Sequence, residues 1–157
     1  IRATPSADAA RGAQPPAGLG QRLLGRERLV FCASPAYLQR RGTPASLQAL
    51  AGQDAVAYGR VDGGASAWQT GAGTIAVQPR MVLGDGEAVV AAVMAGCGIA
   101  QLATWMVEAP LRDGRLLRLL PDAEVDGLPL HLVWPRSRQL LPKVDALLRH
   151  LGQGLAI

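Results

Sequence analysis

The stretch "VLGDGEAVVAAVMAGCGIA", residues 82–100, passes from a short apolar run into a helical pattern within a few residues. Asp85 stands where that pattern begins, and a carboxylate there favours the positive end of a helix dipole. Val89 and Val93 lie four residues apart, so they indicate the face that packs on a core. We therefore predict a helix over 85–95, with glycines before and after it.

Short apolar runs and helical patterns alternate along the rest of the chain. The strands predicted from these runs are 28–33, 54–58, 74–83 with a break at Pro79, 98–102, 114–121 and 128–135. Further helices are predicted over 35–41, 46–50, 105–108 and 142–151, with Ser34 and Thr104 as expected N-caps. Residues 1–20 are rich in Ala, Gly and Pro and are predicted to be a loop or tail. The alternation predicts an α/β fold.

Composition places the chain among single globular domains and argues against several partners. Its 157 residues are 49% apolar, which is too apolar for a disordered protein. The net charge is +4, but the basic residues are scattered and lack the interleaved aromatic side chains of a single-strand nucleic-acid binder. The longest uncharged run, 88–107, is interrupted by glycines, so we predict no membrane span.

The cysteines and glycine-rich segments show no metal or cofactor motif. Cys32 and Cys97 belong to no cluster with metal-ligand spacing and are predicted to be reduced thiols of a cytoplasmic protein. The segment from Gly96 to Gln101 approaches a dinucleotide fingerprint, but it lacks the third glycine and precedes a strand instead of following one. No phosphate-binding loop motif is present in the sequence. We therefore predict no metal and no cofactor.

Candidate catalytic groups are few. His131 and His150 have no acidic residue at a motif spacing, and a lone histidine is a weak candidate for a general base. Asp85 and Glu87 could act as an acid–base pair, but their place at a helix start is explained more simply by the helix dipole. The residues themselves indicate a small-molecule-binding module whose helix start, at Gly84–Gly86, leaves N–H groups for a ligand.

Four segments in order resemble one family. "RLVFCASPAYLQRRGTPASLQAL", "VLGDGEAVVAAVMAGCGIAQLATWMV", "GRLLRLLP" and "LHLVWPRSRQLLPKVDALLRHL" are similar to segments of the effector domain of LysR-type transcriptional regulators. The match runs from about Leu23 to Leu151. The resemblance implies an α/β fold of the type 2 periplasmic-binding-protein kind, with three layers, a mixed sheet and two lobes around a cleft, the first lobe being incomplete here.

The resemblance also implies a domain division and a set of ligand-binding residues. Residues 1–22 are expected to be a flexible remnant of the first lobe, 23–134 the second lobe, and 135–157 a closing segment whose helix returns to the first lobe. The residues expected to bind the ligand are Gly84, Asp85, Gly86, Ser34, Val133 and Trp134.

The function that the resemblance implies is effector sensing. A small anionic molecule in the cleft between the lobes is expected to control DNA binding by a helix-turn-helix domain that these residues do not include. The chain is expected to be a cytoplasmic homo-oligomer, to need no cofactor and no membrane, and to carry no catalytic residue. Two alternatives remain open: a periplasmic solute-binding protein of the same fold, and an enzyme on this fold such as a deaminase or dehydratase.

Overall fold

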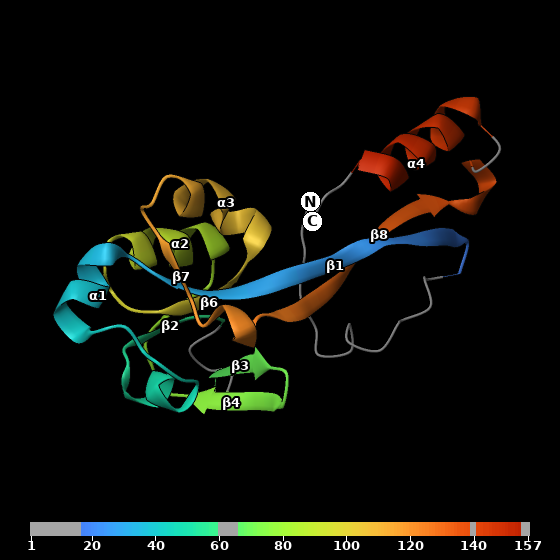
Figure 1. Cartoon of the computed structure of the whole chain (residues 1–157). Coiled ribbons are helices and arrows are strands. Elements are labelled where there is room, and N and C mark those ends of the chain that lie inside the picture. The colour runs from blue at the N-terminus through green and yellow to red at the C-terminus, as the bar shows by residue number, and fades with distance from the viewer. Residues whose placement is uncertain (1–16, 60–65, 139–140, 155–157) are drawn as a thin grey trace. The chain divides into compact units, whose positions relative to one another are not determined.

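A computed structural model of the chain describes residues 17–59, 66–138 and 141–154 (Figure 1). Backbone contacts divide the chain into two compact units. The central unit is Arg28–Gly127, and the terminal unit consists of the described residues on either side of it. The strands β1 and β8 each begin in one unit and end in the other.

Helices and strands alternate through most of the central unit. In chain order, the elements are β1 (Leu19–Ala33), α1 (Pro35–Arg41), η2 (Gln48–Gly52), β2 (Ala55–Tyr58), β3 (Ser66–Thr70), β4 (Gly73–Val77), β5 (Pro79–Leu83), α2 (Gly86–Met94), β6 (Ala100–Ala103), α3 (Thr104–Arg112), β7 (Leu117–Leu119) and η3 (Pro121–Ala123). The chain continues through β8 (Val125–Pro135), η4 (Arg136–Arg138) and α4 (Pro142–Gly154).

The end of β1 is the middle of the core. It pairs antiparallel with β6 on one side and with β7 on the other, and the four residues Val30–Ala33 are 0% exposed. Their side chains alternate between the two faces of the sheet, so that Phe31 packs in one apolar cluster and Val30 in another. Both faces are therefore covered, which explains why this strand is an unbroken apolar run.

Different helices and strands pack on the two faces of the sheet. One cluster contains Tyr37 of α1 and Trp68 of the β3–β4 hairpin, whose ring meets Phe31 edge to face at 5.3 Å between centroids. The other contains Val89 of α2 and Val107 of α3. The end of β1 is thus packed between α1 and the hairpin on one face and α2 and α3 on the other.

The parallel pair β2–β5 joins the main sheet through a short backbone bridge. The N–H of Ile99 donates to the Asp54 carbonyl at 2.9 Å, and the N–H of Val56 donates to the Ile99 carbonyl at 2.8 Å. A side chain at Gly98 would overlap the Asp54 carbonyl. Only glycine therefore lets these two backbone segments approach closely enough to bond.

Strand direction defines two opposite edges of the central unit. β2 and β5 run parallel to each other and to the bridge segment that leads into β6, so Tyr58, Leu83 and Ala103 end at the same edge. We call this the carboxyl edge. β1 is antiparallel to β6, so its last residue, and Ser34 after it, lie at the opposite edge.

The structure confirms the main elements predicted around the opening stretch. α2 occupies most of 85–95, and Val89 and Val93 are fully buried. The predicted run 74–83 divides at Pro79 into β4 and β5. Pro79 is the first residue of β5, where the missing N–H does not interrupt a strand.

The predicted start of the first strand was wrong. β1 begins at Leu19, not at residue 28, and so includes the end of the predicted loop 1–20; residues 1–16 of that loop lie outside the described part of the chain. Residues 19–27 are mostly exposed or half-buried. Backbone pairing with β8 makes them a strand, and such pairing does not need the apolar run on which the prediction relied.

The predicted cap of α3 was also wrong. Ala103 is the N-cap, without a side-chain hydrogen bond, and Thr104 is the first helical residue. α3 continues to Arg112, beyond the predicted 105–108, with Pro110 buried inside it. The predicted strand 114–121 is shorter, because only Leu117–Leu119 pair, with the end of β1.

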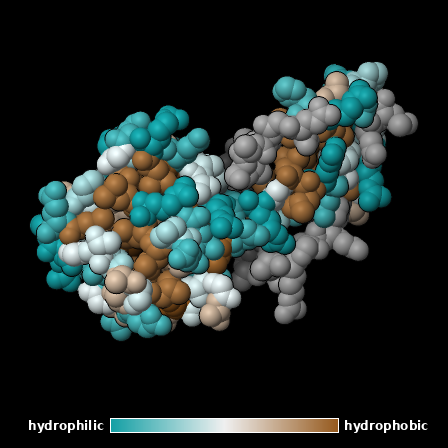
Figure 2. Space-filling model, viewed as in Figure 1, coloured by the Kyte–Doolittle hydropathy of each residue, from teal (hydrophilic) through white to brown (hydrophobic). Residues whose placement is uncertain are grey.

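The terminal unit carries no member of the buried apolar core among its described residues. Several of its large apolar side chains are exposed, namely Leu23, Leu128, Leu130, Val133, Leu141 and Leu147. Apolar surface is visible on the part that carries α4 in Figure 2. This unit therefore presents an apolar face that its own described residues do not cover.

We predict that Gly98→Ala lowers the free energy of unfolding by about 2–3 kcal/mol, because the new methyl group must displace a hydrogen-bonded backbone. Gly52→Ala is the matched control, since a Cβ at Gly52 meets nothing within 4 Å. Urea unfolding of both variants measures the difference. A Gly98→Ala protein as stable as the control would contradict the bridge geometry.

We predict that Cys32 resists alkylation in the folded protein, whereas Cys97 is modified. Burial raises the pKa of the Cys32 thiol to about 12, so this group stays a neutral thiol well above its ordinary pKa of 9.0. Cys97 is half-buried. Iodoacetamide labelling at about pH 8 followed by peptide mass mapping distinguishes the two, since the thiolate is the reactive form. Equal labelling of both cysteines in the native state would contradict the burial of β1.

Candidate functional site

The start of α2 lies at the carboxyl edge and is capped by Asp85. The Asp85 backbone is extended, with φ −133° and ψ 135°, and its Oδ2 accepts a hydrogen bond from the Ala88 N–H at 3.0 Å. Its carbonyl accepts the first helical bond, from the Val89 N–H at 3.2 Å. The Asp85 side chain therefore satisfies one of the N–H groups that a helix start leaves without a partner.

Two further donors remain at this helix start. The N–H groups of Gly86 and Glu87 have no hydrogen-bond partner within the described part of the chain. Both point along the first turn of α2, where the helix dipole favours an acceptor. The carboxylates of Asp85 and Glu87 lie at the same end and offset the positive end of the helix dipole. A ligand acceptor is therefore stabilised here only if it hydrogen-bonds directly to the free N–H groups.

Gly84 and Gly86 differ in what surrounds them. A Cβ at Gly84 would lie 3.8 Å from the Gly59 carbonyl, an ordinary contact, and Gly84 is exposed. A Cβ at Gly86 would lie 2.5 Å from Cε of Met106 in α3. Gly86 thus lets α2 and α3 pack closely, whereas Gly84 leaves open space at the edge.

Two aromatic residues of this edge were not singled out from the sequence. Tyr58 is 51% exposed and is the register partner of Leu83 at the end of β2. Trp105, the second residue of α3, is 58% exposed. Each follows the end of an apolar run, but only the parallel register shows that those ends meet at one edge.

The structure does not bring Ser34 to the carboxyl edge. Ser34 caps α1, since its Oγ accepts from the Tyr37 N–H at 3.3 Å, as the sequence predicted. It is buried beside Gly96, at the far end of α2 from Asp85. Because β1 runs antiparallel to β6, the helix that follows β1 starts at the opposite edge.

Val133 and Trp134 belong to the terminal unit. The Trp134 ring lies against Gly20 of β1, where a Cβ would come within 2.8 Å of it. Val133 is exposed. The close packing of Trp134 on Gly20 gives it a structural role within its own unit.

The described residues contain neither a cluster of metal-ligating side chains nor a helix that could cross a membrane. Over 17–59, 66–138 and 141–154, no group of three or more His, Cys, Asp or Glu side chains is placed to hold a metal ion. None of the helices described there is both long and apolar enough to span a bilayer.

Comparison with known proteins identifies the family of this chain. Residues 8–156 match the family described as LysR substrate binding domain. The chain belongs to this family. The LysR-type resemblance and the α/β fold of the periplasmic-binding-protein kind, both predicted from the sequence, are thereby confirmed.

Relatives of this LysR domain are transcriptional regulators. The uncharacterized HTH-type transcriptional regulator YhjC of Escherichia coli K12 is 34% identical over 154 residues, which cover 90% of this chain and 49% of YhjC. The HTH-type transcriptional regulator CrgA of Neisseria meningitidis serogroup C is 29% identical over 88% of this chain and 48% of CrgA. The chain spans about half the length of the curated relatives it matches.

The fold agrees with solved LysR-type structures. A structure of CrgA from Neisseria meningitidis aligns with a TM-score of 0.76 and 26% identity over 91% of this chain and 50% of that chain. The CrgA regulatory domain alone aligns with a TM-score of 0.74 over 90% of this chain and 71% of that chain.

We predict that Asp85→Ala lowers the free energy of unfolding by about 1 kcal/mol, because α2 loses its cap. Asp85→Asn should lose much less, since its amide oxygen can still accept from the Ala88 N–H. Urea unfolding of the two variants separates loss of the cap from loss of charge. Equal losses in both variants would show that the charge of Asp85, and not its hydrogen bond, stabilises the helix.

Proposed function

We propose that this LysR domain senses a small-molecule effector at the carboxyl edge. The observation that carries the proposal is the free N–H pair of Gly86 and Glu87 at an exposed helix start. Ligands of open α/β sheets bind beyond the carboxyl ends of the strands, and this edge is formed by three such ends. The relatives are regulators, which favours sensing over solute transport or catalysis.

The effector that suits this edge is a small carboxylate. One of its oxygens accepts from the Gly86 and Glu87 N–H groups along the axis of α2. Gly84 leaves room for that approach. The exposed rings of Tyr58 and Trp105 supply apolar surface for the rest of the molecule.

The terminal unit fits the expected first lobe. Its exposed apolar side chains, such as Leu147 of α4, are of the kind that a completed lobe buries. We retain the division into 1–22, 23–134 and 135–157 as a proposal, although contacts place the unit boundaries at Arg28 and Gly127. The cleft between the two lobes likewise stays a prediction.

Control of DNA in the whole protein belongs, in this proposal, to a helix-turn-helix segment such as the one named in the relatives. The effector changes the DNA binding of that segment, and the protein acts as a cytoplasmic homo-oligomer without catalysis. These statements concern the intact regulator. The carboxyl edge of this chain supplies only the sensing step.

Binding of paired probes tests the site. Small carboxylates and their neutral amides, such as benzoate with benzamide and succinate with succinamide, are titrated calorimetrically into the chain. For any carboxylate that binds, Gly84→Asn should weaken affinity by filling the edge. Gly84→Asp should weaken it about tenfold more, because a like charge stands near the bound carboxylate.

The control is Gly71→Asp, which adds the same charge in the exposed β3–β4 turn, where a Cβ meets nothing within 4 Å. Its affinity should equal that of the unmodified chain. Carboxylate binding that is insensitive to both Gly84 variants in folded protein would rule out the edge. Amides that bind as tightly as carboxylates would rule out an anionic effector.

A further inference from the structure

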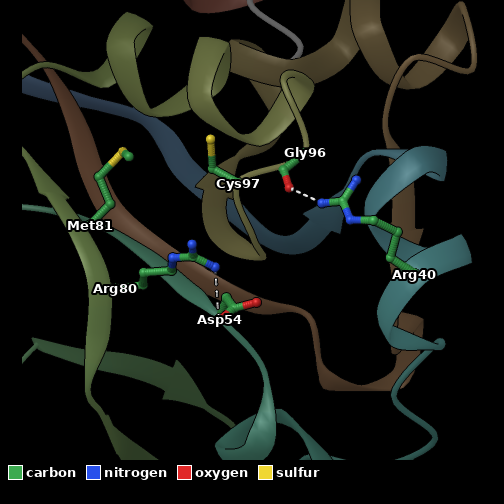
Figure 3. Close-up of a pocket in the computed structure, with 6 residues that line it drawn as sticks. All are labelled: Arg40, Asp54, Arg80, Met81, Gly96 and Cys97. Carbon is green, nitrogen blue, oxygen red and sulfur yellow. Dashed lines mark hydrogen bonds and ion pairs between the residues drawn. The ribbon is translucent and has the colours of Figure 1, made fainter.

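A concave site lies at the opposite edge of the central unit from Gly86. Its lining residues are Arg40, Asp54, Arg80, Met81, Gly96 and Cys97, and its volume is about 240 Å³. We call it the arginine pocket. Figure 3 shows the guanidinium groups of Arg40 and Arg80 extending toward the pocket from opposite sides, with Arg40 bonded to the Gly96 carbonyl and Arg80 paired with Asp54. Gly86 lies at the other end of α2, a helix about 13 Å long.

Among the residues that the structure describes, no acid pairs with the charge of Arg40. Its guanidinium donates to the Gly96 carbonyl at 2.7 Å and to the Ala36 carbonyl at 3.3 Å, both of which are neutral. The first of these bonds also satisfies a carbonyl at the C-terminal end of α2, the negative end of the helix dipole. A guanidinium has five N–H donors, so Arg40 keeps donors as well as its full charge.

The single carboxylate of Asp54 pairs with two other cations, Arg41 and Arg80. Asp54 lies 3.5 Å from Arg41 Nε and 3.6 Å from an Arg80 nitrogen, one on each carboxylate oxygen. The Arg80 side chain is 71% exposed, and such a long, exposed pair contributes little. Two guanidinium groups and one carboxylate line the pocket, so its lining carries one net positive charge; Arg41, which is not a lining residue, also pairs with Asp54.

We propose that the arginine pocket binds a small oxyanion of phosphate or sulfate size. Guanidinium groups match the geometry of oxyanions, and two that converge on one concavity can each donate to a different oxygen. The pocket is smaller than the roughly 300–1,000 Å³ typical of drug-sized ligands. Size and charge together select a compact, highly charged ion over a larger organic effector.

This site is independent of the effector site proposed above. It shares no residue with the carboxyl edge. Binding of an oxyanion there adds no contact with Gly86 or Tyr58. The two sites can therefore be tested separately.

Inorganic phosphate is the probe. It is titrated into the full chain by calorimetry at constant ionic strength, with chloride as the replaced anion, and the amide signals of Gly96 and Cys97 are followed by NMR. We expect saturable binding at one site with shifts of these two signals. Arg80→Gln should weaken affinity about tenfold, the loss expected for one charge-assisted hydrogen bond.

Arg112→Gln is the matched control. The Arg112 side chain is 70% exposed and lies 3.9 Å from an aspartate oxygen. Arg80 is closely similar, since its side chain is 71% exposed and lies 3.6 Å from an aspartate oxygen. The control should leave affinity unchanged, and thermal unfolding should show both variants folded. Arg80→Lys keeps the positive charge but loses the paired N–H donors of the guanidinium. This variant should bind phosphate more weakly than the unmodified chain and more tightly than Arg80→Gln.

Three results of the phosphate titrations would overturn the proposal. They are the absence of saturable phosphate binding, equal losses for Arg80→Gln and Arg112→Gln, and shifts that appear at Gly86 and not at Gly96. The last would assign the phosphate to the start of α2. Sulfate should compete with phosphate for the same signals, and a failure to compete would also contradict an oxyanion site.

Discussion

The close approach of backbone at Gly98 is the constraint on which the central unit depends. Two hydrogen bonds, between Ile99 and the residues on either side of Ala55, join the β2–β5 pair to the sheet built around β1. Without that bridge, the strand ends at Tyr58, Leu83 and Ala103 need not meet at one edge. The position of α2 over the sheet follows from the same bonds, because β5 leads directly into that helix.

The bridge places different chemistry at the two ends of α2. The N-terminal end presents backbone N–H donors beside small residues and exposed aromatic rings. The C-terminal end is held by Arg40, whose bond to Gly96 fixes the turn beside the arginine pocket. Two glycines shape the chain after this C-terminal end, through a left-handed φ of 79° at Gly96 and close backbone approach at Gly98.

Local patterns predicted what depends on local physics. A helix over 85–95 with Val89 on its buried face was predicted from spacing, and Asp85 was placed at its start because a carboxylate there favours the helix dipole. The start of β1 was missed, because residues 19–27 are a strand through backbone pairing and carry no apolar run. Ser34 was correctly predicted as a cap, but a cap motif does not reveal at which edge its helix begins.

The rest of the site depends on how strands that are distant in sequence pair with one another. Tyr58 and Leu83 lie 25 residues apart in sequence and side by side in the parallel pair, which a single sequence does not encode in any spacing. The arginine pocket gathers Arg40 of α1, Asp54 of the loop before β2 and Arg80 of β5 in the same way. The residues themselves predicted the helix start at Gly84–Gly86 and its N–H donors, and the family resemblance assigned that start to a ligand cleft, whereas its neighbours Tyr58 and Trp105 required the fold.

The central claim is that effectors meet this domain at the carboxyl edge. Amide NMR of the ¹⁵N-labelled chain, titrated with a small carboxylate that binds it, tests this most directly. We predict saturable shifts at Gly84, Gly86 and Glu87, with the signal of Tyr58 moving at the same concentrations and that of Tyr37 unchanged. Shifts confined to Tyr37 and the rest of the opposite edge would contradict the account.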